Sequence, residues 1–279
     1  MQLRNRKIEK KDNESQEEKQ LIVESKNMDK KYSDNSRCFR SRGNYVKGEF
    51  FKVSRTTLEL FLNCPTCSYF KHINGLKNIP SPGWSLNSCV DTLSKKEMDK
   101  HRENNTTPEI LLNEKLKLYN HPDLSLWQNN FKGISYYDEN TKFHLYGGID
   151  NVAINEQGEL VVFDVKATSK DENILTKENI FNNGDTYKRQ LEIYTWLFMK
   201  NNFKVSNKGY ILYYNGNKKV DDFNKRMTFR ETLVPIELDL SWIDDTIKDL
   251  YELLNSDTTP KLNENCDTCL YIKLRNCLL

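Results

Sequence analysis

Three side chains suited to metal-assisted hydrolysis lie in two neighbouring apolar segments. Asp150 follows the run FHLYGGI, and Asp164 and Lys166 lie within ELVVFDVKA. A carboxylate embedded among apolar residues is unfavourable unless its charge is compensated. A divalent cation can compensate two carboxylates at once, and a nearby lysine can offset further negative charge. These residue types predict a metal site with an ammonium group beside it.

The spacing of the two segments predicts a β-hairpin over residues 143–167. Residues 156–158 (EQG) suit a three-residue loop with glycine at the position that favours positive φ. With this loop, Asp150 faces Asp164 across the strand pair, and Lys166 projects from the same face. Directly opposed Cβ atoms lie about 4.5–5.5 Å apart, which is close enough for both acids to share one ion.

A Mg²⁺ or Mn²⁺ ion bound by Asp150 and Asp164 would polarise a phosphoryl oxygen and lower the pKa of a bound water. The main-chain carbonyl of Val165 is a candidate for another oxygen ligand. Lys166 is a candidate to orient or deprotonate the water. The competing interpretation is an exposed hairpin with a simple salt bridge, because acid-x-Lys is frequent in charged sequences.

A helix predicted over residues 186–200 adds two candidates to the same site. Gln190 and Tyr194 are four residues apart and so share one helix face. Gln190 could orient the attacking water or a phosphate oxygen. Tyr194 could contact the DNA backbone, or it could simply pack in the core.

The order of GGID, FDVK and QLEIY resembles the RecB-like branch of the PD-(D/E)XK nuclease superfamily, over residues 54–279. The opening SRTTLELFLNCPTCSYF also resembles the first helix of that branch. The resemblance implies an α/β fold of the restriction-endonuclease type, with a mixed central sheet flanked by helices. It also implies that Asp150 and Asp164 bind metal, that Lys166 is the catalytic lysine and that Gln190 is the motif glutamine.

The sequence departs from this branch at one expected metal ligand. The branch has a Gly-x-x-x-His helix before the hairpin, and the counterpart here runs from Asn87 to Asp91. Asp91 could replace the histidine as an oxygen ligand, which would favour a hard metal. It could equally be a solvated helix residue.

Five of the seven cysteines suggest a second site. CPTC at 64–67 and CDTC at 266–269 are C-x-x-C pairs, and clustered cysteines in a cytosolic chain indicate metal ligands before disulfides. One ligand set resembles the [4Fe–4S] cluster of iron–sulfur RecB-like nucleases, including the CRISPR adaptation group, and consists of Cys64, Cys266, Cys269 and Cys277. The other set, which suits zinc or a cluster, consists of Cys64, Cys67, Cys266 and Cys269.

Either set would form a C-terminal cysteine cap from residues 64–67 and 266–277 that closes the domain. Its role would be structural, because the free energy of metal binding becomes free energy of folding. The competing interpretation is a group of free, partly buried thiols.

Composition favours a soluble chain with a polar N-terminal tail. Hydrophobic residues make up 37% and charged residues 29% of the 279 residues, and the net charge is +2. Residues 1–50 carry 13 basic and 9 acidic residues and few apolar ones, so we expect a disordered tail there and the nuclease domain over residues 51–279. The remaining chain is not broadly basic. No membrane span or signal peptide is evident, which predicts a cytoplasmic location.

These observations predict a metal-dependent deoxyribonuclease. By resemblance it acts as an exonuclease or on single-stranded ends, in DNA repair, recombination or defence, with protein partners in a repair or CRISPR complex. The alternative is a catalytically inactive nuclease-fold subunit for nucleic-acid binding or complex assembly. A redox or sensor protein built on the cysteines would leave the acidic hairpin unexplained.

Overall fold

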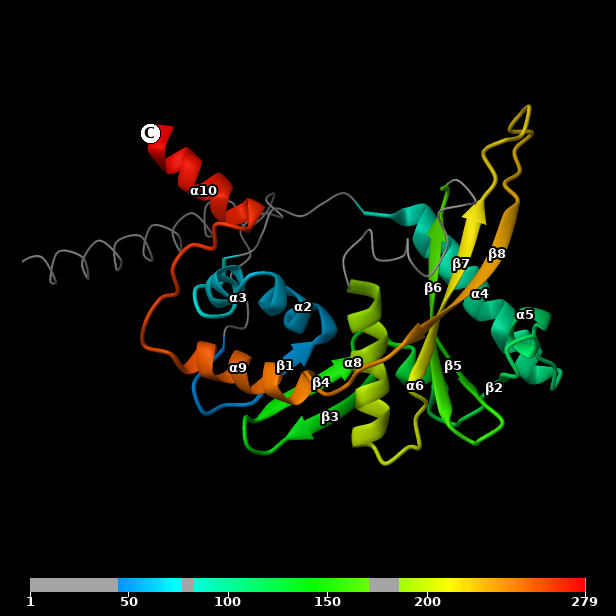
Figure 1. Cartoon of the computed structure of the whole chain (residues 1–279), viewed down its shortest axis with the longest axis horizontal. Coiled ribbons are helices and arrows are strands. Elements are labelled where there is room, and N and C mark those ends of the chain that lie inside the picture. The colour runs from blue at the N-terminus through cyan, green and yellow to red at the C-terminus, as the bar shows by residue number, and fades with distance from the viewer. Residues whose placement is uncertain (1–44, 77–82, 171–185, 279) are drawn as a thin grey trace, which may run out of the picture. The chain divides into compact units, whose positions relative to one another are not determined.

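The computed structural model describes three stretches of chain, residues 45–76, 83–170 and 186–278. They fall into two compact units (Figure 1). The sheet unit comprises the described residues of Phe50–Glu59 and Gly83–Asp249. The cysteine unit comprises the described residues of three segments, 45–49, 60–76 and 250–278.

The tail predicted for residues 1–50 lies mostly outside the described residues. Its last six residues are described, and they do not all behave as a tail. Tyr45 is buried, and its backbone N–H donates to the carbonyl of His72 at 2.8 Å. Tyr45 therefore packs against the folded chain, whereas residues 46–50 are exposed, and Phe51 is buried.

The larger sheet of the sheet unit has five strands. In spatial order they are β2 (Lys117–Leu118), β5 (Asn151–Ile154), β6 (Leu160–Thr168), β7 (Lys208–Gly216) and β8 (Phe229–Glu237). β6 and β7 are parallel, and the other neighbours are antiparallel. The first six residues of β6 are all buried, as expected for a central strand covered on both faces.

The smaller sheet has three strands, β1 (Phe51–Ser54), β4 (Phe143–Gly147) and β3 (Ile134–Asp138), in that order. β1 is parallel to β4, and β3 is antiparallel to it. The predicted α/β class with mixed sheets and flanking helices is confirmed. The strands form two mixed sheets, where the sequence suggested one central sheet.

The hairpin is confirmed in its register and loop. Asn151 pairs with Phe163, and Ile154 pairs with Leu160, which is the predicted alignment. The N–H of Asn155 donates to the carbonyl of Glu159 at 3.0 Å and closes the loop. The loop glycine, at position 158, has a φ of +73°, as its type requires.

The first strand of the predicted hairpin is wrong in its length. The run 143–154 is not one strand. β4 and β5 belong to different sheets, and residues 148–150 between them are not part of either strand. The N–H of Ile149 donates to the carbonyl of Trp127 at 3.0 Å instead of to a neighbouring strand. The break leaves Asp150 immediately before β5.

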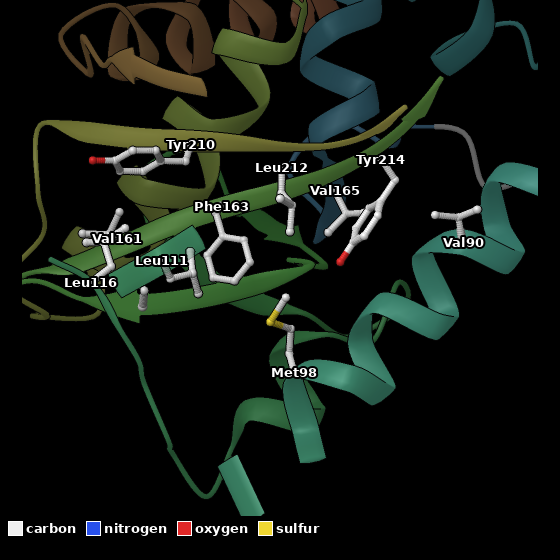
Figure 2. Close-up of a cluster of buried hydrophobic side chains, with 11 residues drawn as sticks. Val90, Met98, Leu111, Leu116, Val161, Phe163, Val165, Tyr210, Leu212 and Tyr214 are labelled. Atoms are coloured by element: carbon white, nitrogen blue, oxygen red, sulfur yellow. The ribbon is translucent and has the colours of Figure 1, made fainter. Parts of the chain in front are cut away.

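Helices cover both faces of the five-stranded sheet. α4 (Ser85–Glu103) and α5 (Glu109–Leu112) lie on one face, where Val90 and Met98 pack with Phe163 and Val165 (Figure 2). α8 (Thr186–Lys200) has the predicted bounds and contacts β6 and β7 as well as β3 and β4. Since side chains alternate along a strand, Asp164 and Lys166 of β6 project to the side of α8.

The other helices of the described stretches have between 4 and 13 residues. In chain order they are α2 (Arg55–Asn63), α3 (Pro65–His72), α6 (Leu124–Trp127), α9 (Ile243–Asn255) and α10 (Asp267–Leu278). Ser54 caps α2, because its Oγ atom accepts the N–H of Thr57 at 3.2 Å. Within the described stretches, none of the helices is long and apolar enough to cross a membrane.

Gly147 allows a close approach between β4 and α8, and its replacement should destabilise the sheet unit. A Cβ atom there would lie 2.4 Å from Cε1 of Tyr194. We expect Gly147→Ala to lower the free energy of unfolding by about 1–3 kcal/mol, as overpacking does. Gly83→Ala is the matched control, since its Cβ would meet nothing within 4 Å. Equal urea unfolding midpoints for the two variants would contradict this account.

Candidate active site

Asp150 occupies the point where the β5–β6 ladder ends. Its Oδ2 atom accepts a hydrogen bond from the N–H of Val165 at 2.9 Å. This side-chain bond replaces the backbone bond that a longer β5 would make with Val165. Gln128 Nε2 donates to the main-chain carbonyl of Asp150 at 2.8 Å. The carboxylate therefore lies beside the exposed edge of β6 and does not continue the strand.

Asp164, Lys166 and Gln190 form a connected polar group between β6 and α8. Lys166 Nζ is ion-paired with Asp164 Oδ2. Gln190 Nε2 donates to Asp164 Oδ1 at 2.8 Å, and Gln190 Oε1 accepts from Lys166 at 3.3 Å. The one amide thus holds both members of the ion pair in place.

Burial and mutual repulsion determine the charge state of these acids. Burial raises the pKa of Asp164 to about 7, against the attraction of Lys166, and the nearby charge of Asp150 raises it further. Burial also opposes ionisation of Asp150, but Lys95 and Lys166 outweigh it and lower its pKa. The pKa of Lys166 is raised despite its burial, because two carboxylates face it.

Asp91 reaches the same region from α4. Lys95, one turn further along that helix, contacts both Asp91 Oδ2 at 3.1 Å and Asp150 Oδ1 at 2.9 Å. Burial and the charge of Asp150 raise the pKa of Asp91. Asp91 therefore faces the candidate metal ligands and is not a freely solvated helix residue.

The three acids are paired with lysines, Asp91 and Asp150 with Lys95 and Asp164 with Lys166. Across the described stretches, Asp91, Asp150 and Asp164 do not place oxygens within 4.8 Å of each other as a trio. The Oδ1 atom of Asp91 is buried and has no hydrogen-bond partner among the described residues. A buried carboxylate oxygen without a hydrogen bond is available as a ligand for a hard cation. The residues present therefore fit a divalent ion.

The site opens into a cleft of about 840 Å³ in the sheet unit. Tyr194 lies on its wall, and its hydroxyl accepts a hydrogen bond from Gln190 Nε2 at 3.2 Å. Tyr187 also lies on the wall, with its ring centroid 5.0 Å from Lys166 Nζ. Arg55 and Trp84 also line the cleft, and the side chain of Trp84 is exposed.

Four of the cysteines converge in the cysteine unit. Sγ atoms of Cys64, Cys67, Cys266 and Cys269 all lie within 4.8 Å of one another. Burial raises the pKa of Cys67, and hydrogen bonds with the neighbouring thiols raise it further. Of the two ligand sets left open by the sequence, this is the one with Cys67. Cys277 is exposed and is not part of the group.

Comparison with known proteins identifies the family. The family model of the PD-(D/E)XK nuclease superfamily matches residues 85–274, which is more than half of the chain. The chain belongs to the PD-(D/E)XK nuclease superfamily. The matched range contains the hairpin with its two acids and lysine, and the glutamine on α8. Members of this superfamily are usually nucleases, which suggests a nuclease-type function that uses a divalent metal.

Two other comparisons add little to the family assignment. The crystal structure of SSO0001 is similar at 18% sequence identity and a TM-score of 0.36, and the match covers 84% of this chain and 90% of that one. No curated protein sequence matches the chain.

Within this PD-(D/E)XK chain, the sequence did not reveal three residues of the site. Lys95 carries a visible signal, because Asp91 and Lys95 have the i, i+4 spacing of a helical ion pair. Tyr187 lies three residues before Gln190, so it shares the helix face of the motif glutamine. Gln128 comes from a region without a readable pattern, and only the fold brings it to Asp150.

Lys95 should influence both stability and metal affinity. Lys95→Gln removes the ammonium group that bridges Asp91 and Asp150, so we expect about 1–3 kcal/mol lower stability in buffer without divalent ions. Added Mg²⁺ should raise the thermal midpoint of this variant more than that of the wild type, because no ammonium group competes for the acids.

The matched control for this prediction is Lys96→Gln, at the neighbouring, exposed position of α4. Its stability should stay within about 0.5 kcal/mol of the wild type, and its response to Mg²⁺ should be unchanged. Identical behaviour of the two variants would contradict the role given to Lys95.

Proposed function

We propose that the chain is a metal-dependent deoxyribonuclease that hydrolyses phosphodiester bonds. The observation that carries the proposal is the Asp164–Lys166 ion pair, held by Gln190 beside Asp150 on the wall of one cleft. A buried acid–lysine pair of this kind is a poor stabilising device compared with apolar packing, so a catalytic role explains it better.

In this proposal the oxygens of Asp150 and Asp164 hold Mg²⁺ or Mn²⁺, with Asp91 and the Val165 carbonyl as further candidates. The N–H and C=O groups of a strand residue point to the same side, so the Val165 carbonyl shares the open edge at which its N–H meets Asp150. The bound ion would polarise the scissile phosphate and lower the pKa of a coordinated water.

Lys166 and Gln190 have distinct parts in the reaction. Lys166 orients the water and offsets the negative charge that develops on the phosphate. Gln190 is a positioning residue, because both ends of its amide bind Asp164 and Lys166. It fixes the direction of the ammonium group. The sequence suggested instead that it orients the attacking water or a phosphate oxygen, and either role would require one of these bonds to open.

Nucleic acid is the substrate class that the cleft walls fit best. Arg55 can pair with a phosphate, and an exposed aromatic side chain offers a stacking surface for a base. Trp84 is 76% exposed on this wall. A tryptophan that stacks on unpaired bases favours single-stranded DNA or frayed ends, which agrees with the preference suggested by the resemblance to the RecB-like branch.

A catalytically inactive nucleic-acid-binding subunit is the second candidate. The observation in its favour is Lys95, which already bridges Asp91 and Asp150 and competes with a metal for their oxygens. The intact Asp150, Asp164 and Lys166 argue against it. The absence of cleavage by wild-type protein with either metal would make this candidate the better one.

The catalytic proposal is tested with labelled single- and double-stranded DNA in the presence of Mg²⁺ or Mn²⁺. Asp164→Asn should lose its metal ligand charge, and Lys166→Gln should lose its ammonium group, so we expect each rate to fall at least about 100-fold. Asp222→Asn, in an exposed loop, is the control and should cleave as the wild type does.

Circular dichroism should show that all three variants are folded, which separates lost chemistry from lost structure. Wild-type cleavage rates in both site variants would refute the assignment of these residues.

The contribution of Trp84 can be measured by binding of a single-stranded oligonucleotide without added metal. Base stacking on an aromatic ring contributes about 1–3 kcal/mol, so Trp84→Ala should weaken binding by about 5- to 150-fold. Phe131→Ala is the control, because Phe131 is 79% exposed but does not line the cleft. Equal loss in both variants, or none in either, would contradict stacking at Trp84.

A further inference from the structure

The four clustered cysteines carry an inference that is independent of the nuclease activity. We propose that Cys64, Cys67, Cys266 and Cys269 bind a single tetrahedral zinc ion and not an iron–sulfur cluster. Three sulfur–sulfur distances support it: 3.6 Å for Cys64–Cys269, 3.7 Å for Cys67–Cys266 and 3.7 Å for Cys67–Cys269. The choice between the two cofactors follows from these distances.

One ion and a cluster require different spacings of the thiolates. A zinc–sulfur bond is about 2.3 Å long, so four thiolates around one tetrahedral ion lie about 3.8 Å from one another. The measured distances match this edge length, and all four sulfurs lie within 4.8 Å. In a [4Fe–4S] cluster each thiolate extends outward from a different iron, so the sulfurs must be farther apart than around one ion.

A disulfide bond and a chance grouping of free thiols are the two simpler interpretations of the cluster. A disulfide bond is about 2.05 Å long, and the cysteines of this group are all free. A chance grouping of free thiols does not explain why two separate C-x-x-C pairs meet in one buried group. Cys64 and Cys269 are 205 positions apart in the sequence.

Both C-x-x-C pairs use the same local structure to receive the ion. Cys64 caps α3, and its sulfur accepts the N–H of Cys67 at 3.3 Å. Cys266 likewise directly precedes α10, and its carbonyl accepts the N–H of Leu270 at 2.8 Å, as the carbonyl of Cys64 accepts that of Ser68 at 3.0 Å. The N–H of Cys67 stabilises a thiolate at Cys64, and a zinc ion with four thiolates carries net negative charge that such a donor offsets. The thiols release their protons to solvent when the ion binds.

The ion would be the main attachment of α10 within the cysteine unit. Cys269 is the one side chain of this helix that is buried. The large apolar side chains beside it are exposed, namely Leu270, Tyr271, Ile272, Leu274 and Leu278. A helix with so little apolar burial does not hold its place by packing, so metal binding supplies the free energy that a core would otherwise supply.

The proposal is tested by elemental analysis of full-length protein expressed with both zinc and iron in the medium and purified without oxygen. We expect one zinc per chain, no iron or sulfide, and no broad visible absorbance. Stoichiometric iron and sulfide with the absorbance of a cluster would overturn the proposal, and so would the absence of any bound metal.

Variants and a spectroscopic probe identify the ligands. Cys67→Ser should bind less than about a tenth of the wild-type zinc, since it removes one thiolate of four, whereas Cys277→Ser and Cys89→Ser should retain one zinc per chain. Because Cys67→Ser can fail to fold, wild-type protein stripped by a chelator and refilled with Co²⁺ provides a second readout. Its spectrum should show the visible bands of tetrahedral Co²⁺ with four thiolates, and so should that of Cys277→Ser. Loss of these bands in Cys277→Ser, or an octahedral spectrum in the wild type, would refute the ligand set.

Discussion

Compensation of buried negative charge is the constraint on which the candidate active site depends. The side chain of Asp164 is 1% exposed, and a carboxylate in that position is tolerable only with a cation close by. Lys166 supplies this charge from the same strand, and Gln190 satisfies the remaining oxygen from α8. The neighbouring carboxylate of Asp150 also needs a counter-charge, and Lys95 of α4 provides it. In this site the charges of the carboxylates are balanced by ammonium groups. A divalent metal would compete with these ammonium groups for the carboxylate oxygens.

The fold provides this balance by interrupting the strands at one place. β4 ends at Gly147, where the absence of a side chain lets the ring of Tyr194 approach. The chain then leaves the small sheet and begins β5 only after Asp150. Because β5 ends its pairing at Asn151, the edge of β6 beyond Phe163 stays open to polar groups. The same break that shortens the hairpin thus leaves the edge of β6 unpaired beside Asp150.

Local patterns in the sequence were sufficient for the hairpin register, its loop glycine and the bounds of α8. These features are fixed by contacts between residues close in sequence, and their side-chain periodicity is direct. The division of the strands into two sheets was not predictable, since it depends on the contact of Gly147 with α8 and on the Ile149–Trp127 hydrogen bond. Lys95 was missed for a related reason: its contact with Asp150 joins residues 55 positions apart, and only the tertiary packing of α4 reveals it. The cysteines show the same limit, because spacing left two ligand sets open and the measured sulfur distances favour one.

We propose that Asp150 and Asp164 share a divalent ion beside Lys166. Crystals of the wild-type protein soaked in Mn²⁺ test this proposal most directly, because anomalous scattering locates manganese without reference to activity. We expect an anomalous peak within bonding distance of oxygens from both acids, with the ammonium group of Lys95 displaced from Asp150. Carboxylates that remain paired with Lys95 and Lys166, with no manganese between them at a saturating concentration, would contradict it.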